Sequence, residues 1–137
     1  MTAQIMDSLK GFVPFIAYFG GGVALLILFS LVYSLVTPYS EYKLLRQGKT
    51  APAISFGGAI LGFTCPLFAA IFHSANFLDM VLWALIALII QILVFVVLRL
   101  LFSHLIKDIS EDKKGPAIFL AFVSISIGVI NAASMTY

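Results

Sequence analysis

Few side chains in this sequence could carry out chemistry, and their spacing does not bring them together. The titratable groups nearest the long apolar segments are Glu41, His73 and Asp79, and each falls at the end of such a segment. Acid–base and nucleophilic catalysis both need a base within hydrogen-bond reach of its partner. The chain shows no nucleophile–base pair, phosphate-binding glycine loop or metal-ligand spacing. We therefore predict no catalytic, cofactor-binding or metal-binding residue, and a protein that is not an enzyme.

The single cysteine, Cys65, lies inside an apolar run and has no second cysteine to pair with. His73 lacks a second histidine or an acid cluster, so we favour a role at the membrane interface over metal binding or pH sensing. Proton-coupled transport commonly uses a titratable carboxylate or histidine inside the membrane, and here Glu41, His73 and Asp79 all lie at the interface. This arrangement weighs against proton-driven transport.

Neutral polar groups do occur deep inside the apolar segments. Gln91 lies roughly 17 Å from one end of its segment, near the midplane, and Thr64 and Pro66 reach a similar depth from the other side. Pro66 cannot donate to the carbonyl of Gly62, which then needs another partner. We predict that Gln91 or Thr64 supplies that hydrogen bond. A ligand or permeation role for Gln91 is the alternative.

Small residues recur where another helix would pack. Gly57, Gly58 and Gly62 in the second apolar segment allow a neighbouring backbone to come close, as in small-xxx-small contacts. Ser124, Gly128 and Ala132 form a similar face on the last segment, with Asn131 beside them. For that face we favour a helix–helix seam over a small polar cavity that opens outward.

The composition indicates the class that these features belong to. The chain of 137 residues is 62% hydrophobic and only 10% charged, whereas soluble domains carry about 25% charged residues. So many apolar side chains cannot be buried in so small a core, and lipid must surround them. A net charge of +2 does not indicate nucleic-acid binding. We predict an all-α membrane protein that forms one membrane domain over residues 1–137.

Charged residues divide the chain into four apolar segments, each long enough for the roughly 20 residues of a membrane helix. We place the spans near residues 13–36, 53–74, 80–101 and 116–136. Seven of the eight basic residues lie in or beside the first and third loops. The positive-inside rule then puts these loops in the cytoplasm and both termini outside, in the periplasm. The basic residues of these loops are Lys43, Arg46, Lys49, Lys107, Lys113 and Lys114.

The two halves of the chain resemble each other. Lys49-Thr-Ala-Pro-Ala-Ile aligns with Lys113-Lys-Gly-Pro-Ala-Ile at an offset of 64 residues. Each half reads as a helix, a basic loop and a second helix, so the copies point the same way. We predict two parallel-repeat hairpins, at about 13–74 and about 80–136.

Several stretches together resemble a known family. They are Thr37-Pro-Tyr-Ser-Glu-Tyr, Ser55-Phe-Gly-Gly-Ala-Ile-Leu-Gly-Phe-Thr-Cys-Pro-Leu, Trp83-Ala-Leu-Ile-Ala-Leu-Ile-Ile-Gln and Asn131-Ala-Ala-Ser-Met-Thr-Tyr. The chain resembles the YjfL-like family of small bacterial inner-membrane proteins of unknown function, over nearly its whole length. The segment Lys49-Thr-Ala-Pro52 departs from the small residues usual there, so we expect the start of the second span to differ from that of the family.

The resemblance implies a bacterial inner-membrane location and a repeated two-helix unit, and it brings no assigned catalytic residue. Relatives often have genes near envelope-stress proteins of the phage-shock type and near a glutathionylspermidine-synthase-like enzyme. By association, it implies a role in membrane maintenance.

Two main functions follow as hypotheses. The first is a non-enzymatic homo-oligomer in envelope homeostasis that contacts lipid and docks a cytoplasmic partner on its basic loops. The second is a small oligomeric channel or facilitative transporter lined by Gln91, Thr64, Ser126 and Asn131. A third hypothesis, a lipid- or quinone-binding module, would place lipid between the first two spans, beside their glycines.

Overall fold

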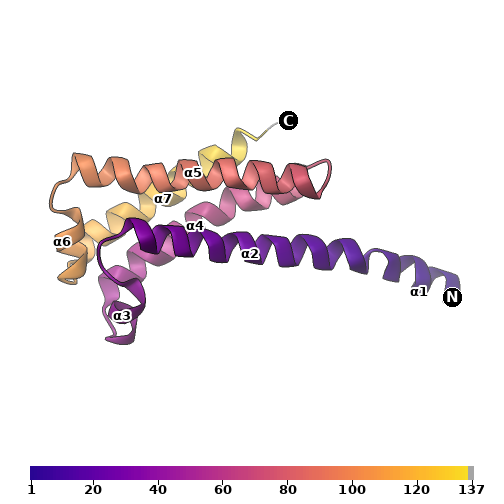
Figure 1. The fold of residues 1–137 in the computed structure, drawn as a ribbon, viewed down its shortest axis with the longest axis horizontal. Helices are drawn as coiled ribbons and strands as arrows, with labels where there is room; N and C mark the ends of the chain where they lie inside the picture. Colours follow the sequence, from indigo (N-terminus) through magenta and orange to yellow (C-terminus); the bar gives the residue numbers. More distant parts are fainter. Residues whose placement is uncertain (136–137) are drawn as a thin grey trace.

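The chain is almost entirely helical in a computed structural model that describes residues 1–135. Figure 1 shows four long helices side by side, with short helices in two of the connections. The elements of this part of the chain are α1 (Thr2–Lys10), α2 (Phe12–Val36), α3 (Glu41–Arg46), α4 (Thr50–His73), α5 (Phe77–Leu101), α6 (Leu105–Ser110) and α7 (Lys114–Ala133).

Four helices are long and apolar enough to cross a membrane, as the sequence predicts. They are Thr2–Val36, which joins α1 and α2, then Thr50–His73, Phe77–Leu101 and Lys114–Ala133. The prediction of an all-α membrane protein with four spans is confirmed. The second and fourth helices begin two or three residues before the predicted starts. The side of the membrane on which the termini lie stays a prediction.

The ends of the long helices follow from local chemistry. The residue before a proline avoids the helical region, and Thr37, before Pro38, is extended at φ −79° and ψ 135°, where α2 ends. Gly48 then adopts φ 77° between α3 and α4, a conformation that glycine reaches without strain. In the matching position before α7, Asp112 adopts φ 65°.

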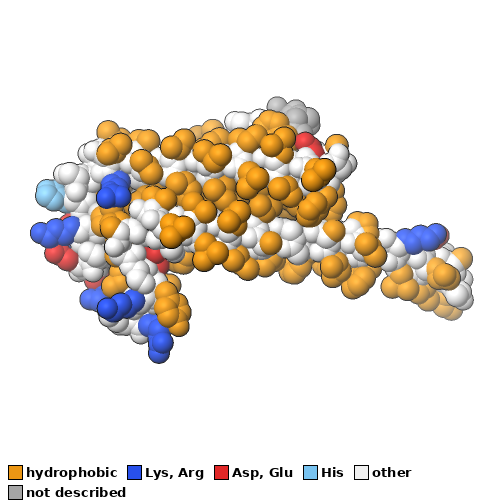
Figure 2. All heavy atoms as spheres, viewed as in Figure 1, with side chains coloured by type: hydrophobic (Ala, Val, Ile, Leu, Met, Phe, Trp, Pro, Cys, Tyr) orange, Lys and Arg blue, Asp and Glu red, His pale blue; other side chains and the backbone are white. Residues whose placement is uncertain are grey.

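The helix α4 is the centre of the bundle. It contacts α2, α3, α5, α6 and α7, and it packs most extensively against α7. Its buried face consists mostly of small residues and prolines, whereas α2 buries only Gly22, Leu25, Phe29 and Tyr33. Exposed apolar side chains of α2 and α5 cover most of the face shown in Figure 2, as expected of a surface that faces lipid.

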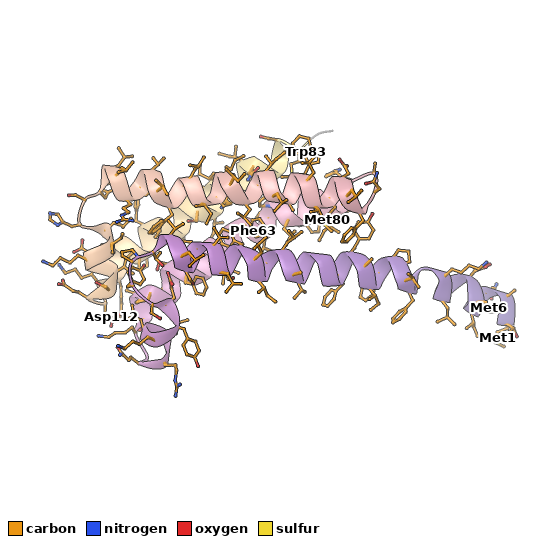
Figure 3. The ribbon with its side chains drawn as sticks, in the orientation of Figure 1. Met1, Met6, Phe63, Met80, Trp83 and Asp112 are labelled. Atoms are coloured by element: carbon orange, nitrogen blue, oxygen red, sulfur yellow. The ribbon has the colours of Figure 1, made fainter. Side chains whose placement is uncertain are left out.

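Aromatic rings fill the space between α2, α4 and α5. Phe63, labelled in Figure 3, stacks on Phe29 with ring centroids 4.7 Å apart. Tyr33 packs edge-on against Phe95 at 5.2 Å and stacks on Phe56 at 5.6 Å. This cluster fixes the cytoplasm-proximal half of α2 against α4 in the predicted topology.

The helix α1 continues the line of α2 past the bundle. Only Gly11, itself in the helical region, separates the two, and α1 buries no residue. Figure 1 shows it extending beyond the other helices. The segment Thr2–Lys10 is therefore helical but adds no residue to the buried core.

The helix bounds recur along the chain at the offset that the sequence predicts. α3 and α6 begin and end 64 residues apart, and α4 and α7 begin 64 residues apart. Such recurrence is what two parallel hairpins require. A common origin of the two halves stays a prediction.

Candidate functional site

The contact between α4 and α7 is so close that side chains would not fit in it. A Cβ on Gly58 would collide with Ala121, and a Cβ on Gly62 would lie 2.5 Å from the carbonyl oxygen of Ser124. Gly128 likewise lies directly against the carbonyl of Gly62. These three glycines therefore occupy the close helix contact that their spacing predicts.

Gly57 does not take part in this seam, which corrects the sequence prediction. It is exposed, and a Cβ there would meet nothing within 4 Å. Consecutive residues on a helix point about 100° apart. For this reason only one residue of the Gly57–Gly58 pair faces α7.

The hydrogen bond predicted for the Gly62 carbonyl is also corrected. The Gln91 amide donates to the carbonyl of Ser124 at 3.1 Å, and Thr64 donates to Ile60 within its own helix at 2.8 Å. The carbonyl oxygen that Pro66 leaves free lies against Gly128, where a Cβ would collide with it. Weak Cα–H···O contacts occur at such close approaches between helices. Gln91 still lies at this seam, because a Cβ on Gly62 would come within 2.9 Å of its nitrogen.

The other polar side chains of the predicted pathway are also engaged with backbone. Asn131 is buried, and its amide lies 3.5 Å from the carbonyl of Ala87 on α5. Ser126 is exposed on α7 and donates to Phe122 at 2.7 Å. A hollow of about 200 Å³ beside Asn131 is lined mostly by isoleucines. The structure therefore places Gln91 beside the α4–α7 seam and Asn131 at the contact of α7 with α5, and it leaves Ser126 exposed.

A buried polar cluster at the α3 end of the bundle is the feature that sequence reasoning missed. The carboxyl of Glu41 is almost fully buried, at 2% exposure, and one of its oxygens accepts a hydrogen bond from Thr37 at 2.5 Å. Its other oxygen has no hydrogen-bond partner, and the same is true of the hydroxyls of Tyr33 and Tyr39. Ser55, fully buried on α4, lies close to both tyrosines and donates to Pro52 at 3.1 Å.

Local sequence explains how Glu41 comes to be buried. The Ser40 side chain accepts a hydrogen bond from the Lys43 backbone and caps α3, which turns the chain back over the end of α4. Glu41 and Leu44 then share the face of α3 that points toward the bundle. The signal in the sequence is that Glu41 is the first charged residue after the uncharged run of residues 11–40.

Burial also changes the titration of Tyr39, which lies outside the membrane helices. Loss of solvent around its hydroxyl raises its pKa from 10.0 to about 12. The nearby Ser55 hydroxyl opposes this shift, and the charge of Glu41 adds to it. The phenol is therefore neutral at physiological pH.

The basic loops lie together at one end of the molecule. Figure 2 shows most blue side chains gathered at the end formed by α3 and α6. Lys113 pairs with Asp108 at 3.3 Å and Glu111 at 3.9 Å, and Arg46 lies over the ring of Tyr42. Of the remaining basic side chains of the two loops, Lys43, Lys107 and Lys114 are exposed and Lys49 is half-buried.

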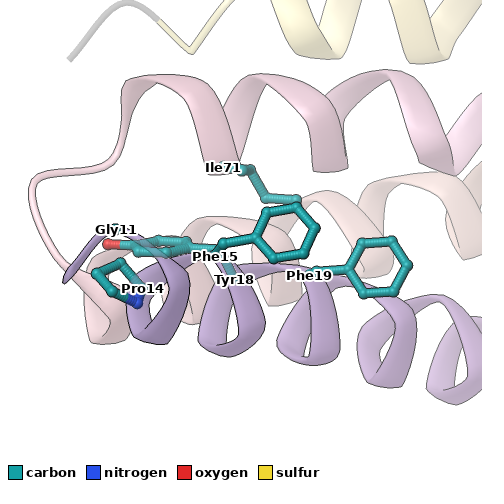
Figure 4. Close-up of a pocket in the computed structure, with 6 residues that line it drawn as sticks. All are labelled: Gly11, Pro14, Phe15, Tyr18, Phe19 and Ile71. Atoms are coloured by element: carbon teal, nitrogen blue, oxygen red, sulfur yellow. The ribbon is translucent and has the colours of Figure 1, made fainter. Parts of the chain in front are cut away.

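Two apolar hollows lie between α2 and the far end of α4. The larger, of about 440 Å³, is lined by Gly11, Pro14, Phe15, Tyr18, Phe19 and Ile71, and Figure 4 shows it in close-up. The smaller, of about 180 Å³, continues past Gly22. The mostly apolar lining of both hollows suits lipid acyl chains. Across residues 1–135, no three metal-ligating side chains come together.

Comparisons with known proteins agree with this architecture. A family model described as Domain of Unknown Function (DUF350) matches residues 7–135. The inner membrane protein YjfL of Escherichia coli strain K12 is 37% identical over 98% of this chain and 99% of its own length, and its counterpart in strain O157:H7 matches equally. The transmembrane protein YshE of Bacillus subtilis strain 168 is 24% identical over 87% of this chain and 90% of its own. No solved structure matches.

Proposed function

Since the chain belongs to the DUF350 family, which includes inner-membrane proteins of the YjfL type, we propose that it is a non-enzymatic oligomeric platform in envelope homeostasis. Its inner-membrane location follows from the names of these relatives and from its four membrane-spanning helices. The proposed activity is to hold a cytoplasmic partner at the end formed by α3 and α6.

One observation carries this proposal. The polar groups nearest the membrane midplane serve contacts between helices, because Gln91 bonds Ser124 across the bundle and Gly62 packs against Gly128. A seam in which a Cβ would collide with backbone has no room for a solute. One copy therefore offers no polar path from one face to the other among its described residues.

The charge distribution supports the docking role. Lys43 and Arg46 project from α3, and Lys107 projects from α6 on the same end of the bundle. These cations remain exposed, whereas Lys113 is engaged by its acidic neighbours. A cationic face at the cytoplasmic surface suits an acidic protein surface beside anionic lipid.

A complementation experiment tests the platform. Cells that lack the gene would be challenged with a membrane-permeabilising agent and supplied with wild-type protein or with the double variant Lys43→Gln, Arg46→Gln. We expect the double variant to restore survival at least tenfold less well at equal membrane abundance. The matched control is Lys10→Gln, which removes a basic residue from the opposite end. Full rescue by the double variant would contradict docking at this face.

The alternative function is a channel or transporter, which would require a path between several copies of this chain. The exposed hydroxyl of Ser126 on α7 is the observation that favours it, since an oligomer could bury this group. Vesicles that contain the purified protein would be assayed for flux of ions and small amines. We expect flux no greater than in empty vesicles. Flux that falls in Ser126→Ala would overturn the platform and support the channel.

A further inference from the structure

The carboxyl of Glu41 is buried without a countercharge. It is 2% exposed, and no ion pair involves it among residues 1–135. Buried charges in proteins are paired, bind a metal ion or become neutral, because the loss of hydration costs several kcal/mol. None of the described side chains forms an ion pair with Glu41 that would supply a countercharge.

Oxygen atoms from three parts of the fold surround this position. Tyr33 comes from α2, Thr37 and Tyr39 from the segment after it, and Ser55 from α4. Thr37 contacts the carboxylate directly. The free carboxylate oxygen and both tyrosine hydroxyls are shielded from solvent. The carboxylate oxygen has no hydrogen-bond partner, and the Ser55 hydroxyl is a close polar neighbour of both phenols.

A proton on Glu41 would remove the charge but would leave these atoms unsatisfied. The Thr37 hydroxyl, which also lies 3.2 Å from the carbonyl of Ser34, would remain the hydrogen-bond partner of the carboxyl. The other carboxyl oxygen would still lack a partner. A cation between the oxygens would remove the charge and use several lone pairs at once. Hard cations prefer such all-oxygen surroundings.

The matching position in the second half shows that the fold itself does not need these polar groups. At the offset of 64 residues, Leu105 corresponds to Glu41 and Phe119 corresponds to Ser55. Leu105 is buried at the start of α6 just as Glu41 is at the start of α3. An apolar residue serves this turn in the second half, so the polar cluster in the first half has a separate purpose.

We propose that Glu41, with the hydroxyls of Tyr33 and Tyr39, binds a monovalent alkali cation at the α3 end of the bundle. One carboxylate matches one monovalent charge, whereas a divalent cation would leave a buried positive charge uncompensated. The acids of the other loop are engaged elsewhere, since Asp108 pairs with Lys113 and Asp112 accepts from the backbone of Ala51. The bound cation links α2, α3 and α4.

The test measures thermal unfolding of the full chain in lipid nanodiscs at neutral pH. Sodium, potassium, lithium and choline chlorides would be compared at equal ionic strength. We expect at least one alkali cation to raise the wild-type Tm by about 3 °C or more relative to choline, because ligand binding stabilises the folded state. The Glu41→Gln variant, which preserves the size of the side chain, should show no difference between salts.

Two further variants separate the site from general salt effects. Glu111→Gln removes an exposed carboxylate from the other loop and should keep the wild-type response. Tyr39→Phe removes one ligand oxygen and should raise the cation concentration for the half-maximal Tm shift several-fold, even if Glu41→Gln fails to fold. Equal Tm values in all four salts would overturn the site. An alkali effect that persists in both Glu41→Gln and Tyr39→Phe would overturn it as well.

Discussion

Glycine at position 62 sets how closely α4 and α7 approach. An alanine there would place its Cβ 2.5 Å from the Ser124 carbonyl oxygen and 2.9 Å from the Gln91 nitrogen. We expect Gly62→Ala to destabilise the fold by about 2 kcal/mol, since backbone atoms cannot move aside as a side chain can. This cost exceeds the gain of about 1 kcal/mol in helix propensity.

The matched control lies on the same helix. Gly57 has open space around its Cα, so Gly57→Ala should gain helix propensity without a clash. Unfolding in nanodiscs would compare the two variants. If both have the same stability, the close seam does not exist in the membrane.

Tyr39 provides a prediction about alkaline pH. Its pKa is raised to about 12 by burial, so the folded state favours the neutral phenol. The stability gained in this way is complete below the unfolded pKa of about 10 and is lost as the pH rises from about 10 to about 12. We expect Tyr39→Phe to flatten the stability curve in this window. Tyr42→Phe, at an exposed ring, should leave the slope unchanged, and an equal loss of slope in both variants would contradict the assignment.

At the scale of the elements, one helix cap adds a link between the two halves of the chain. The Asp112 carboxylate accepts a hydrogen bond from the backbone N–H of Ala51 at 2.8 Å, across 61 residues of sequence. Figure 3 labels Asp112 at the end of the bundle near α3. Asp112→Ala should cost about 1–2 kcal/mol, because it removes the cap and places alanine at φ 65°.

The variant Asp112→Asn separates the effect of the hydrogen bond to Ala51 from the effect of the negative charge. Asparagine tolerates this backbone conformation and retains an oxygen that can accept from Ala51. We expect it to keep most of the wild-type stability in the same unfolding assay. A loss as large as that of alanine would mean that the negative charge near the start of α4 dominates.

The positions of the long helices could be predicted from the sequence, whereas the faces through which they contact one another could not. Charges divide the chain so clearly that the four spans follow from their positions, and Pro38 marks the end of α2. The rotation of α4 could not be inferred in the same way, because its apolar residues surround it without a polar face. Gly57 and Gly58 therefore looked equivalent. The burial of Glu41 was not predicted, because α3 has only six residues and Glu41 becomes buried where α3 contacts α4.

At the scale of the whole molecule, the arrangement of the helices leaves two possible orientations in the membrane. The end of α7 and the end that carries α1 lie away from α3 and α6 (Figure 1). The basic residues gather on the α3 and α6 end, and Lys10 is the basic residue at the other. The positive-inside rule therefore predicts that α3 and α6 face the cytoplasm.

Cysteine labelling in intact cells tests this orientation, and the chain suits the method because Cys65 is its single cysteine. In a Cys65→Ala background, Ser8→Cys, Lys43→Cys and Lys107→Cys would be treated separately with a membrane-impermeant maleimide. We expect labelling of Ser8→Cys from outside, and labelling of the two loop variants only after the cells are lysed. All three positions are exposed in the folded chain, so a failure to react reflects the membrane and not burial. The reverse pattern would place the basic end in the periplasm, where it could not dock a cytoplasmic partner.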